Sequence, residues 1–367
     1  MNGLYIHIPF CLKKCNYCDF ASFPSLVSRG DEYIDAICRE MMLYKGECVD
    51  TVYLGGGTPT VLKTDQIGRI MDGIRTAFDV SSDAEITIEA NPGTVDGNKA
   101  KSLCNLGFNR VSLGAQSMVD DELQSLGRLH SADDTRRAYA AFADAGFSNI
   151  SLDLMYAIPG QTMASLSTSM TQMLNLNPKH ISCYGLKIED GTPFDAMLSK
   201  GEICEKSDEE YADMYDYICE SLASHDYMQY ELSNFSKSSY ESRHNLKYWT
   251  SGDYIGIGLS AASCFGGRRY TRTSDFADYI ESFENAECIE LDADDRMSEY
   301  MILSLRLTSR GAIKSEFESM FGISMERRFG EALAKHVKNG LLLDLGDRYV
   351  LSKKAYYISN SVLCDFI

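Results

Sequence analysis

Short apolar, β-branched runs alternate with longer helical patterns through the first half of the chain, and this alternation constrains the fold more than any other feature. The expected strands are 4–10, 51–57, 85–91, 110–116, 149–158 and 180–188. The expected helices are 31–45, 64–78, 96–105, 131–145 and 162–175. Strands joined by crossover helices form a parallel sheet, open or curved into a barrel, with functional groups at the carboxyl ends of the strands. The sequence therefore predicts an α/β fold.

After residue 190 the alternation stops. A helix is expected at 208–224 and a strand at 228–235. The expected helices 295–308, 313–320 and 325–339, followed by a short hairpin over 341–351, resemble a winged helix. We therefore expect an α/β core over 1–235, a connecting segment over 236–290, and a smaller, mainly helical C-terminal domain over 291–367.

The chain has 53 acidic and 35 basic residues, for a net charge of −18. This charge repels nucleic-acid phosphates, and no local basic patch offsets it, so the winged-helix shape predicts packing or partner docking rather than DNA binding. No secretory signal opens the chain and no run of 18 apolar residues follows. We expect a monomer or homodimer in the cytoplasm, at most peripherally associated with a membrane. There the 12 cysteines should be reduced, and those outside the motif described next should be small buried hydrophobes.

Three cysteines, Cys11, Cys15 and Cys18, directly follow the first expected strand. A structural zinc site closes with four ligands, and an Fe–S cluster used for electron transfer is held by four cysteines. Three thiolates leave one iron position open, where a cofactor or substrate can bind. The triplet therefore predicts an open iron centre. The alternative is that the three cysteines are unrelated buried thiols. Three cysteines would occur at this spacing by chance in about one chain in a hundred.

Polar residues mark the ends of the next strands. The glycine-rich run 55–59 closes the second strand and lets backbone approach a ligand. Glu89, Gln116 and Asp153 lie at or near the ends of the third, fourth and fifth strands, and Arg128 follows Gln116 by twelve residues. Any one of them, taken alone, is equally well explained as a buried residue whose hydrogen bonds to its neighbours serve only the structure. Together they predict a polar ring around one ligand with the amine, carboxylate and hydroxyl groups of a zwitterionic nucleoside.

The motifs Cys-x3-Cys-x-Tyr-Cys, Gly-Gly-Gly-Thr-Pro and Glu-Ala-Asn-Pro resemble the radical S-adenosylmethionine (SAM) superfamily. In detail, and from Tyr5 to the C-terminus, the chain is similar to the oxygen-independent coproporphyrinogen III oxidase-like group. The resemblance implies a partial (β/α)6 barrel that carries a [4Fe–4S] cluster, with SAM chelating the fourth iron. It assigns Cys11, Cys15 and Cys18 to the cluster, and Tyr5, Tyr17, Gly56, Gly57, Thr58, Glu89, Gln116, Arg128 and Asp153 to cluster-bound SAM.

Within that resemblance the residues take separate roles. Tyr5 is placed beside the cluster and SAM, and Tyr17 contacts the adenine through its backbone. Residues 56–58 lie under the methionine amino group. The polar ring contacts the remaining polar groups of SAM.

Two departures distinguish branches of the group. The oxidases carry a fourth cysteine two residues beyond the triplet and an N-terminal extension, whereas this chain has Phe20 at that position and begins ten residues before Cys11. His244-Asn245-x-x-Tyr248-Trp249 instead resembles the haem chaperone branch, in which this motif is implicated in haem binding. A neutral imidazole is a common axial haem ligand, so His244 becomes a candidate ligand. A hydrogen-bonded loop histidine is the alternative.

The resemblance thus implies a haem carrier that delivers haem to acceptor haemoproteins such as respiratory enzymes. The alternative is an oxygen-independent coproporphyrinogen III oxidase, which decarboxylates its substrate to protoporphyrinogen IX by radical SAM chemistry. Whether the carrier also consumes SAM is left open by the sequence.

Overall fold

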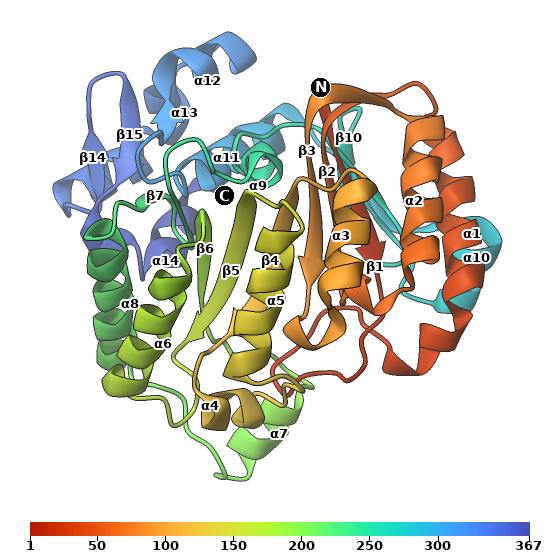
Figure 1. Ribbon diagram of the computed structural model, residues 1–367. Helices are drawn as coiled ribbons and strands as arrows, with labels where there is room; N and C mark the ends of the chain where they lie inside the picture. Colours follow the sequence, from red (N-terminus) through yellow and green to blue (C-terminus); the bar gives the residue numbers. More distant parts are fainter.

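A computed structural model describes residues 1–367. Its centre is a 12-stranded sheet in the order β12-β11-β10-β9-β1-β2-β3-β4-β5-β6-β8-β7 (Figure 1). Six consecutive strands are parallel: β1 (Asn2–Ile8), β2 (Cys48–Gly56), β3 (Asp79–Ala90), β4 (Arg110–Gln116), β5 (Asn149–Tyr156) and β6 (His180–Gly185). This confirms the expected α/β fold with a parallel sheet.

The crossover helices run along the outer face of the sheet (Figure 1). They are α1 (Gly30–Met41), α2 (Thr64–Ala77), α3 (Gly97–Asn105), α5 (Ala132–Asp144) and α6 (Met163–Leu176). Their starts follow local chemistry, since the Asp96, Ser131 and Thr162 side chains each accept a hydrogen bond from a backbone N–H of the first turn. Between helices and strands lies one large apolar core, which includes Leu4, Ile6 and other fully buried side chains. The carboxyl ends of the strands thereby stay free to carry polar groups.

The segment 236–290 extends this sheet beyond β1. It supplies helix α9 (Arg243–Trp249), strand β9 (Tyr254–Ile257), strands β10 (Ala262–Phe265) and β11 (Arg268–Arg272), helix α10 (Phe276–Ser282) and strand β12 (Asn285–Glu290). β9 runs parallel to β1, and the following strands are antiparallel. At the opposite edge, β7 (Met228–Glu231) and β8 (Asn234–Ser236) form a hairpin after helix α8 (Asp208–Ala223). The single strand expected over 228–235 is therefore wrong, because a tight turn at Leu232 and Ser233 divides it.

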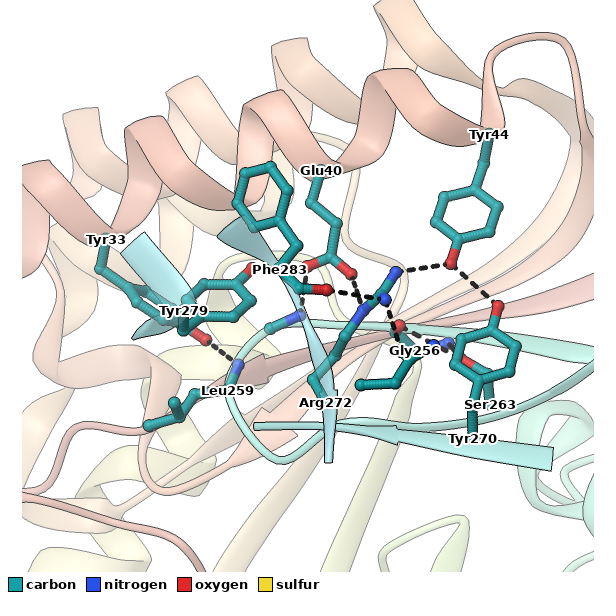
Figure 2. Close-up of polar contacts among 12 residues, drawn as sticks. Tyr33, Glu40, Tyr44, Gly256, Leu259, Ser263, Tyr270, Arg272, Tyr279 and Phe283 are labelled. Atoms are coloured by element: carbon teal, nitrogen blue, oxygen red, sulfur yellow. Dashed lines mark hydrogen bonds and ion pairs between the residues drawn. The ribbon is translucent and has the colours of Figure 1, made fainter. Parts of the chain in front are cut away.

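A buried ion pair fastens this extension to α1 (Figure 2). The Glu40 carboxylate is 0% exposed and lies 2.6 Å from Nε of Arg272 on β11. Tyr279 donates a hydrogen bond of 2.5 Å to Glu40, and the Gly258 N–H donates one of 3.0 Å. Arg272 also donates to the Phe283 carbonyl at 2.9 Å. Because the charges are paired and hydrogen-bonded, the ion pair can stay buried and hold the added strands beside β1.

The C-terminal residues form a smaller unit with its own apolar core. It consists of α11 (Ala293–Ser304), β13 (Ala312–Ile313), α12 (Lys314–Phe321), α13 (Met325–Lys338), β14 (Leu342–Asp344), β15 (Arg348–Leu351) and α14 (Ser359–Leu363). Its strands make a small antiparallel sheet in the order β13-β15-β14. The mainly helical, winged-helix-like C-terminal unit is thus present, and it lies beside α8 at the upper left of Figure 1.

Short helices complete the chain. They are α4 (Asp120–Ser125), α7 (Pro193–Ser199) and the 3-10 turns Pro24–Arg29, Met42–Tyr44, Pro59–Val61, Pro92–Thr94, Lys353–Ala355 and Cys364–Phe366. None of the helices is both long and apolar enough to cross a membrane. The cysteines are all unpaired, but outside the triplet only Cys183 is fully buried. The expectation that these cysteines are buried is wrong for the exposed residues Cys48, Cys204, Cys288 and Cys364, and the remaining four are half-buried.

Candidate functional site

The cysteine triplet lies on the loop that leaves the carboxyl end of β1. Three contacts hold this loop: the Phe23 N–H donates to the Pro9 carbonyl at 2.7 Å, the Asn16 N–H donates to the Leu126 carbonyl at 3.0 Å, and Nε2 of His7 is 2.8 Å from the Ala21 carbonyl oxygen. His7 is buried on β1. The loop is therefore fixed to β1 and to the segment after α4, with its cysteines between them.

The three thiols do not converge on one point as the ligands of a single metal ion would. A [4Fe–4S] cluster fits this arrangement better, because each cysteine then binds a different iron. Burial raises the pKa of the Cys11 and Cys18 thiols, so both would need a bound metal to ionise at neutral pH. Cys11 also shares a 3.5 Å contact with Thr58 Oγ1, and Nη1 of Arg128 lies 3.6 Å from Cys15 Sγ.

The glycine-rich end of β2 packs directly against the cysteine loop. The Gly57 N–H donates to the Ile8 carbonyl at 2.9 Å, and the Thr58 N–H donates to the Phe10 carbonyl at 2.7 Å. A Cβ atom on Gly57 would lie 2.6 Å from the Phe10 carbonyl oxygen, closer than non-bonded atoms approach. Gly56 has φ +105°, a conformation that favours glycine. The glycines therefore allow two backbone segments to meet beneath the cysteines.

Glu89, at the end of β3, forms one wall of the site. Its Oε1 accepts a 2.7 Å hydrogen bond from the Tyr53 hydroxyl, and its Oε2 accepts a 3.1 Å bond from the Gly56 N–H. Removal from bulk water raises the pKa of Glu89 from its ordinary value of 4.5 to about 7, against the lowering effect of the Tyr53 hydrogen bond. A cation placed beside this carboxyl would ionise it and bind tightly.

β4 and β5 continue this wall, since Ser112 on β4 pairs with Glu89 on β3. Asp153 accepts hydrogen bonds of 3.0 and 3.1 Å from the Ser112 hydroxyl, and burial raises its pKa. Arg128 is anchored by a 2.7 Å hydrogen bond to the Gly114 carbonyl. Gln116 has φ +64°, a left-handed conformation that non-glycine residues adopt rarely and that often marks functional sites.

These groups surround a single cavity of about 410 Å³, a size suited to a cofactor. The expected site residues that line it are Cys11, Cys15, Cys18, Tyr17, Gly56, Gly57, Thr58, Glu89, Gln116, Arg128 and Asp153. Tyr5 lies just beneath, where its hydroxyl is 3.0 Å from Nδ1 of His7. The cavity thus offers carboxylates, a guanidinium and backbone N–H groups around the cysteine loop, the donor set that a cluster and a zwitterionic nucleoside require.

His244 lies elsewhere, on α9 and away from the cavity surface. It is 1% exposed, and both ring nitrogens are occupied: Nδ1 is 2.9 Å from Thr51 Oγ1, and Nε2 is 2.8 Å from the Tyr248 hydroxyl. Burial lowers its pKa to about 3, so the ring is neutral. In this arrangement neither nitrogen is free to bind haem iron. Trp249 is not exposed as a flat platform either, because the Arg306 guanidinium covers its ring at 4.6 Å.

Several residues of the site were missed from the sequence. His7 anchors the cysteine loop, Tyr53 orients Glu89, and Arg110 and Asn245 also line the cavity. The signal for one of them was present: His7 follows Tyr5 by two positions, so it shares one face of β1 with an expected site residue. Asn245 belongs to the motif singled out in the sequence, but its place at the cavity depends on where α9 docks.

Comparison with known proteins defines the class. Residues 5–172 match the family model of the radical SAM superfamily, and residues 291–358 match that of the HemN C-terminal domain. The match to the first model spans β1, the cysteine loop and the polar wall described above. Membership in the radical SAM superfamily implies a [4Fe–4S] cluster and SAM, and the cavity carries residues that fit both.

Full-length relatives narrow this class. The chain is 34% identical to the Heme chaperone HemW of Lactococcus lactis subsp. lactis (strain IL1403), over 100% of this chain and 97% of that protein. It is also 34% identical to Heme chaperone HemW of Bacillus subtilis (strain 168), over 100% and 99% of the two chains. The chain belongs to the HemW family of radical SAM proteins. Among solved structures, coproporphyrinogen III oxidase (HemN) from Escherichia coli superposes with a TM-score of 0.86 at 24% identity, over 99% of this chain and 89% of that one, which shows a shared fold.

Proposed function

We propose that the protein binds haem and delivers it to acceptor haemoproteins such as respiratory enzymes, while it carries a [4Fe–4S] cluster with SAM on the open iron. The observation that carries this proposal is the end-to-end similarity to proteins named heme chaperones, at 31–34% identity. The chain spans both the cluster-binding part and the C-terminal domain of those relatives.

Cys11, Cys15 and Cys18 would hold the cluster, whose bound form supplies one-electron reductive cleavage of SAM. Glu89 would accept hydrogen bonds from the SAM ammonium group, and Asp153 from the ribose hydroxyls. Arg128 would pair with the carboxylate. These roles follow from charge: among the charged groups that line the cavity, the Glu89 carboxylate suits the cationic end of SAM and the Arg128 guanidinium suits its anionic end.

Coproporphyrinogen III oxidation is the competing function. The likeness to the solved oxidase concerns the fold, which many chemistries share. Phe20 occupies the position of the fourth cysteine of the oxidases, and its side chain is 64% exposed at the rim of the cavity. This substitution supports the carrier over the oxidase.

The haem position within the carrier is not assigned to His244. Ligation by that residue requires it to leave a pocket in which both nitrogens are hydrogen-bonded, and breaking two such bonds costs roughly 1–3 kcal/mol. The haem-binding part of the proposal rests on the relatives, and the cluster and SAM part rests on the cavity.

Haem transfer tests the proposal. Anaerobically reconstituted protein is titrated with haem, separated from free haem, and mixed with an apo-haemoprotein whose absorbance reports loading. We expect close to one haem per chain and its transfer to the acceptor. The Cys11, Cys15 and Cys18 triple alanine variant, tested in parallel, shows whether transfer needs the cluster. Absence of haem binding by the wild type would contradict the proposal.

A further inference from the structure

Helix α9 lies at the end of the cavity farthest from the cysteine loop. In Figure 1 it lies at the amino-terminal ends of the strands, whereas α4 and α7 lie at their carboxyl ends. Lys247 donates to the Met1 carbonyl at 2.9 Å, which places the helix beside the start of β1. Asn245, the second residue of the motif, lines the cavity itself. Of this motif, Asn245 thus forms part of the floor of the cavity, while His244 lies behind it.

α9 is fixed at both ends. At its first turn the buried Glu85 carboxylate accepts hydrogen bonds of 3.1 Å from the backbone N–H groups of Arg243 and His244. At its last turn the Arg306 guanidinium of the C-terminal unit covers the Trp249 ring. With the helix held in this way, the His244 ring has little freedom to move.

The His244 ring contacts the side chain that orients Glu89. It stacks on Tyr53 with ring centroids 5.1 Å apart and an interplanar angle of 25°. The Tyr53 hydroxyl in turn donates the 2.7 Å hydrogen bond to Glu89 Oε1. A continuous chain of contacts therefore runs from His244 through Tyr53 to the carboxylate at the cavity wall.

We propose that His244 is a positioning residue of the SAM site: its ring holds Tyr53, and Tyr53 holds the Glu89 carboxylate that receives the SAM ammonium group. The hydrogen bonds with Thr51 and Tyr248 fix the plane of the imidazole, against which the Tyr53 ring stacks. This inference rests on the SAM binding proposed above and not on haem transport. It gives the first residue of the motif a role in binding SAM.

His180 provides a matched control. It is also a fully buried barrel histidine with both nitrogens engaged, Nδ1 at 2.8 Å from Ser151 Oγ and Nε2 at 2.8 Å from the Tyr230 hydroxyl. Neither of its partners hydrogen-bonds Glu89. The Tyr230 hydroxyl also accepts a 3.3 Å hydrogen bond from the Ser242 N–H at the start of α9, but replacing His180 by Ala leaves His244, Tyr53 and Glu89 and their mutual contacts in place.

The test is a double-mutant cycle on SAM affinity, measured by calorimetry on cluster-loaded protein. Tyr53→Phe removes the hydroxyl that donates to Glu89 and should weaken SAM binding about tenfold. His244→Ala should weaken it about fivefold, and the double variant should bind within about twofold of Tyr53→Phe alone, because both substitutions act on one hydrogen bond. His180→Ala should bind SAM within about twofold of the wild type.

The pH dependence of SAM affinity distinguishes a positioning role of His244 from a general loosening of the protein interior. The Tyr53 hydrogen bond lowers the Glu89 pKa, while Asp153 on β5 raises it and Arg110 on β4 lowers it. Loss of that bond in His244→Ala should therefore move the pH below which SAM binding weakens to a higher value, and His180→Ala should leave it unchanged. Additive losses in the cycle, or an equal effect of His180→Ala, would overturn the inference. Failure of the wild type to bind SAM would instead overturn the proposed function.

Discussion

Replacing Glu89 by Gln should make the protein more stable above neutral pH and a weaker SAM binder at the same time. In the folded state the pKa of this carboxyl is about 7, against an ordinary value of 4.5. The difference corresponds to at most about 3 kcal/mol against holding the group ionised. Gln removes this cost but cannot accept from both Tyr53 and the Gly56 N–H, and the lost bond costs about 1–3 kcal/mol.

The pH dependence follows from the sign of the shift. A carboxyl whose folded pKa is raised binds more protons in the folded state between pH 4.5 and about 7, so its contribution to stability falls as pH rises through that window and is constant above it. Glu89→Gln lacks this loss. The stability of the variant relative to wild type should therefore increase from about pH 5 to about pH 8, by up to about 3 kcal/mol.

SAM affinity should change in the opposite direction. A hydrogen bond between the carboxylate and an ammonium group contributes about 1.5–3 kcal/mol, so the variant should bind SAM about ten- to a hundredfold more weakly at pH 8. Wild-type affinity should also fall as pH drops below about 7, since Glu89 must release its proton, while the variant stays flat. Urea denaturation of SAM-free, cluster-loaded protein at about pH 5 and about pH 8 measures the change in stability. Calorimetry at the same two pH values measures the change in SAM affinity. Equal SAM affinity, together with a stability difference that is the same at both pH values, would refute the reasoning.

Three further predictions concern the cluster, the glycine contact and the buried ion pair. Cys15→Ala should abolish the brown chromophore and lower iron content after reconstitution, while Cys264→Ala should leave both unchanged; full iron in the first variant would contradict the cluster assignment. Gly57→Ala places a Cβ atom 2.6 Å from a backbone oxygen of the cysteine loop, so iron loading and thermal stability should both fall, by about 1–3 kcal/mol for stability; normal values would show that the loop can move aside. Arg272→Met leaves the fully buried Glu40 charge without its partner, so the free energy of unfolding should fall by about 3–5 kcal/mol in urea denaturation. Adding Glu40→Gln in the same chain should restore part of this loss, and no recovery would argue against the ion pair.

The parallel sheet was readable from the sequence because each strand carries its own local signal. β4 begins and ends at the predicted residues, Arg110 and Gln116, since an apolar run there is bounded by a turn and a polar end. The polar ring followed from topology: carboxyl ends of parallel strands meet at one edge, so Glu89 and Asp153 had to come close. Prediction worked wherever one strand or one rule of sheet geometry decided the outcome.

The extension and α9 were not readable in the same way. β9 to β12 have four to six residues each, and β12 is exposed along its whole length, so no apolar alternation marks it. α9 has seven residues, too few for a periodic stripe. The place of His244 depends on Thr51, a residue 193 positions earlier in the chain. Such long-range partners carry no local sequence signal, so the sequence left open whether His244 is a haem ligand or a hydrogen-bonded histidine.

The most direct test of the carrier proposal compares haem binding with coproporphyrinogen III oxidation by one preparation of the protein. Cluster-loaded protein is given haem in one vessel, and coproporphyrinogen III with SAM and a reductant in another, under strict anaerobiosis. A carrier should retain close to one haem per chain and form no protoporphyrinogen. Several turnovers of coproporphyrinogen III per chain, with no retained haem, would contradict the carrier and make the protein an oxidase.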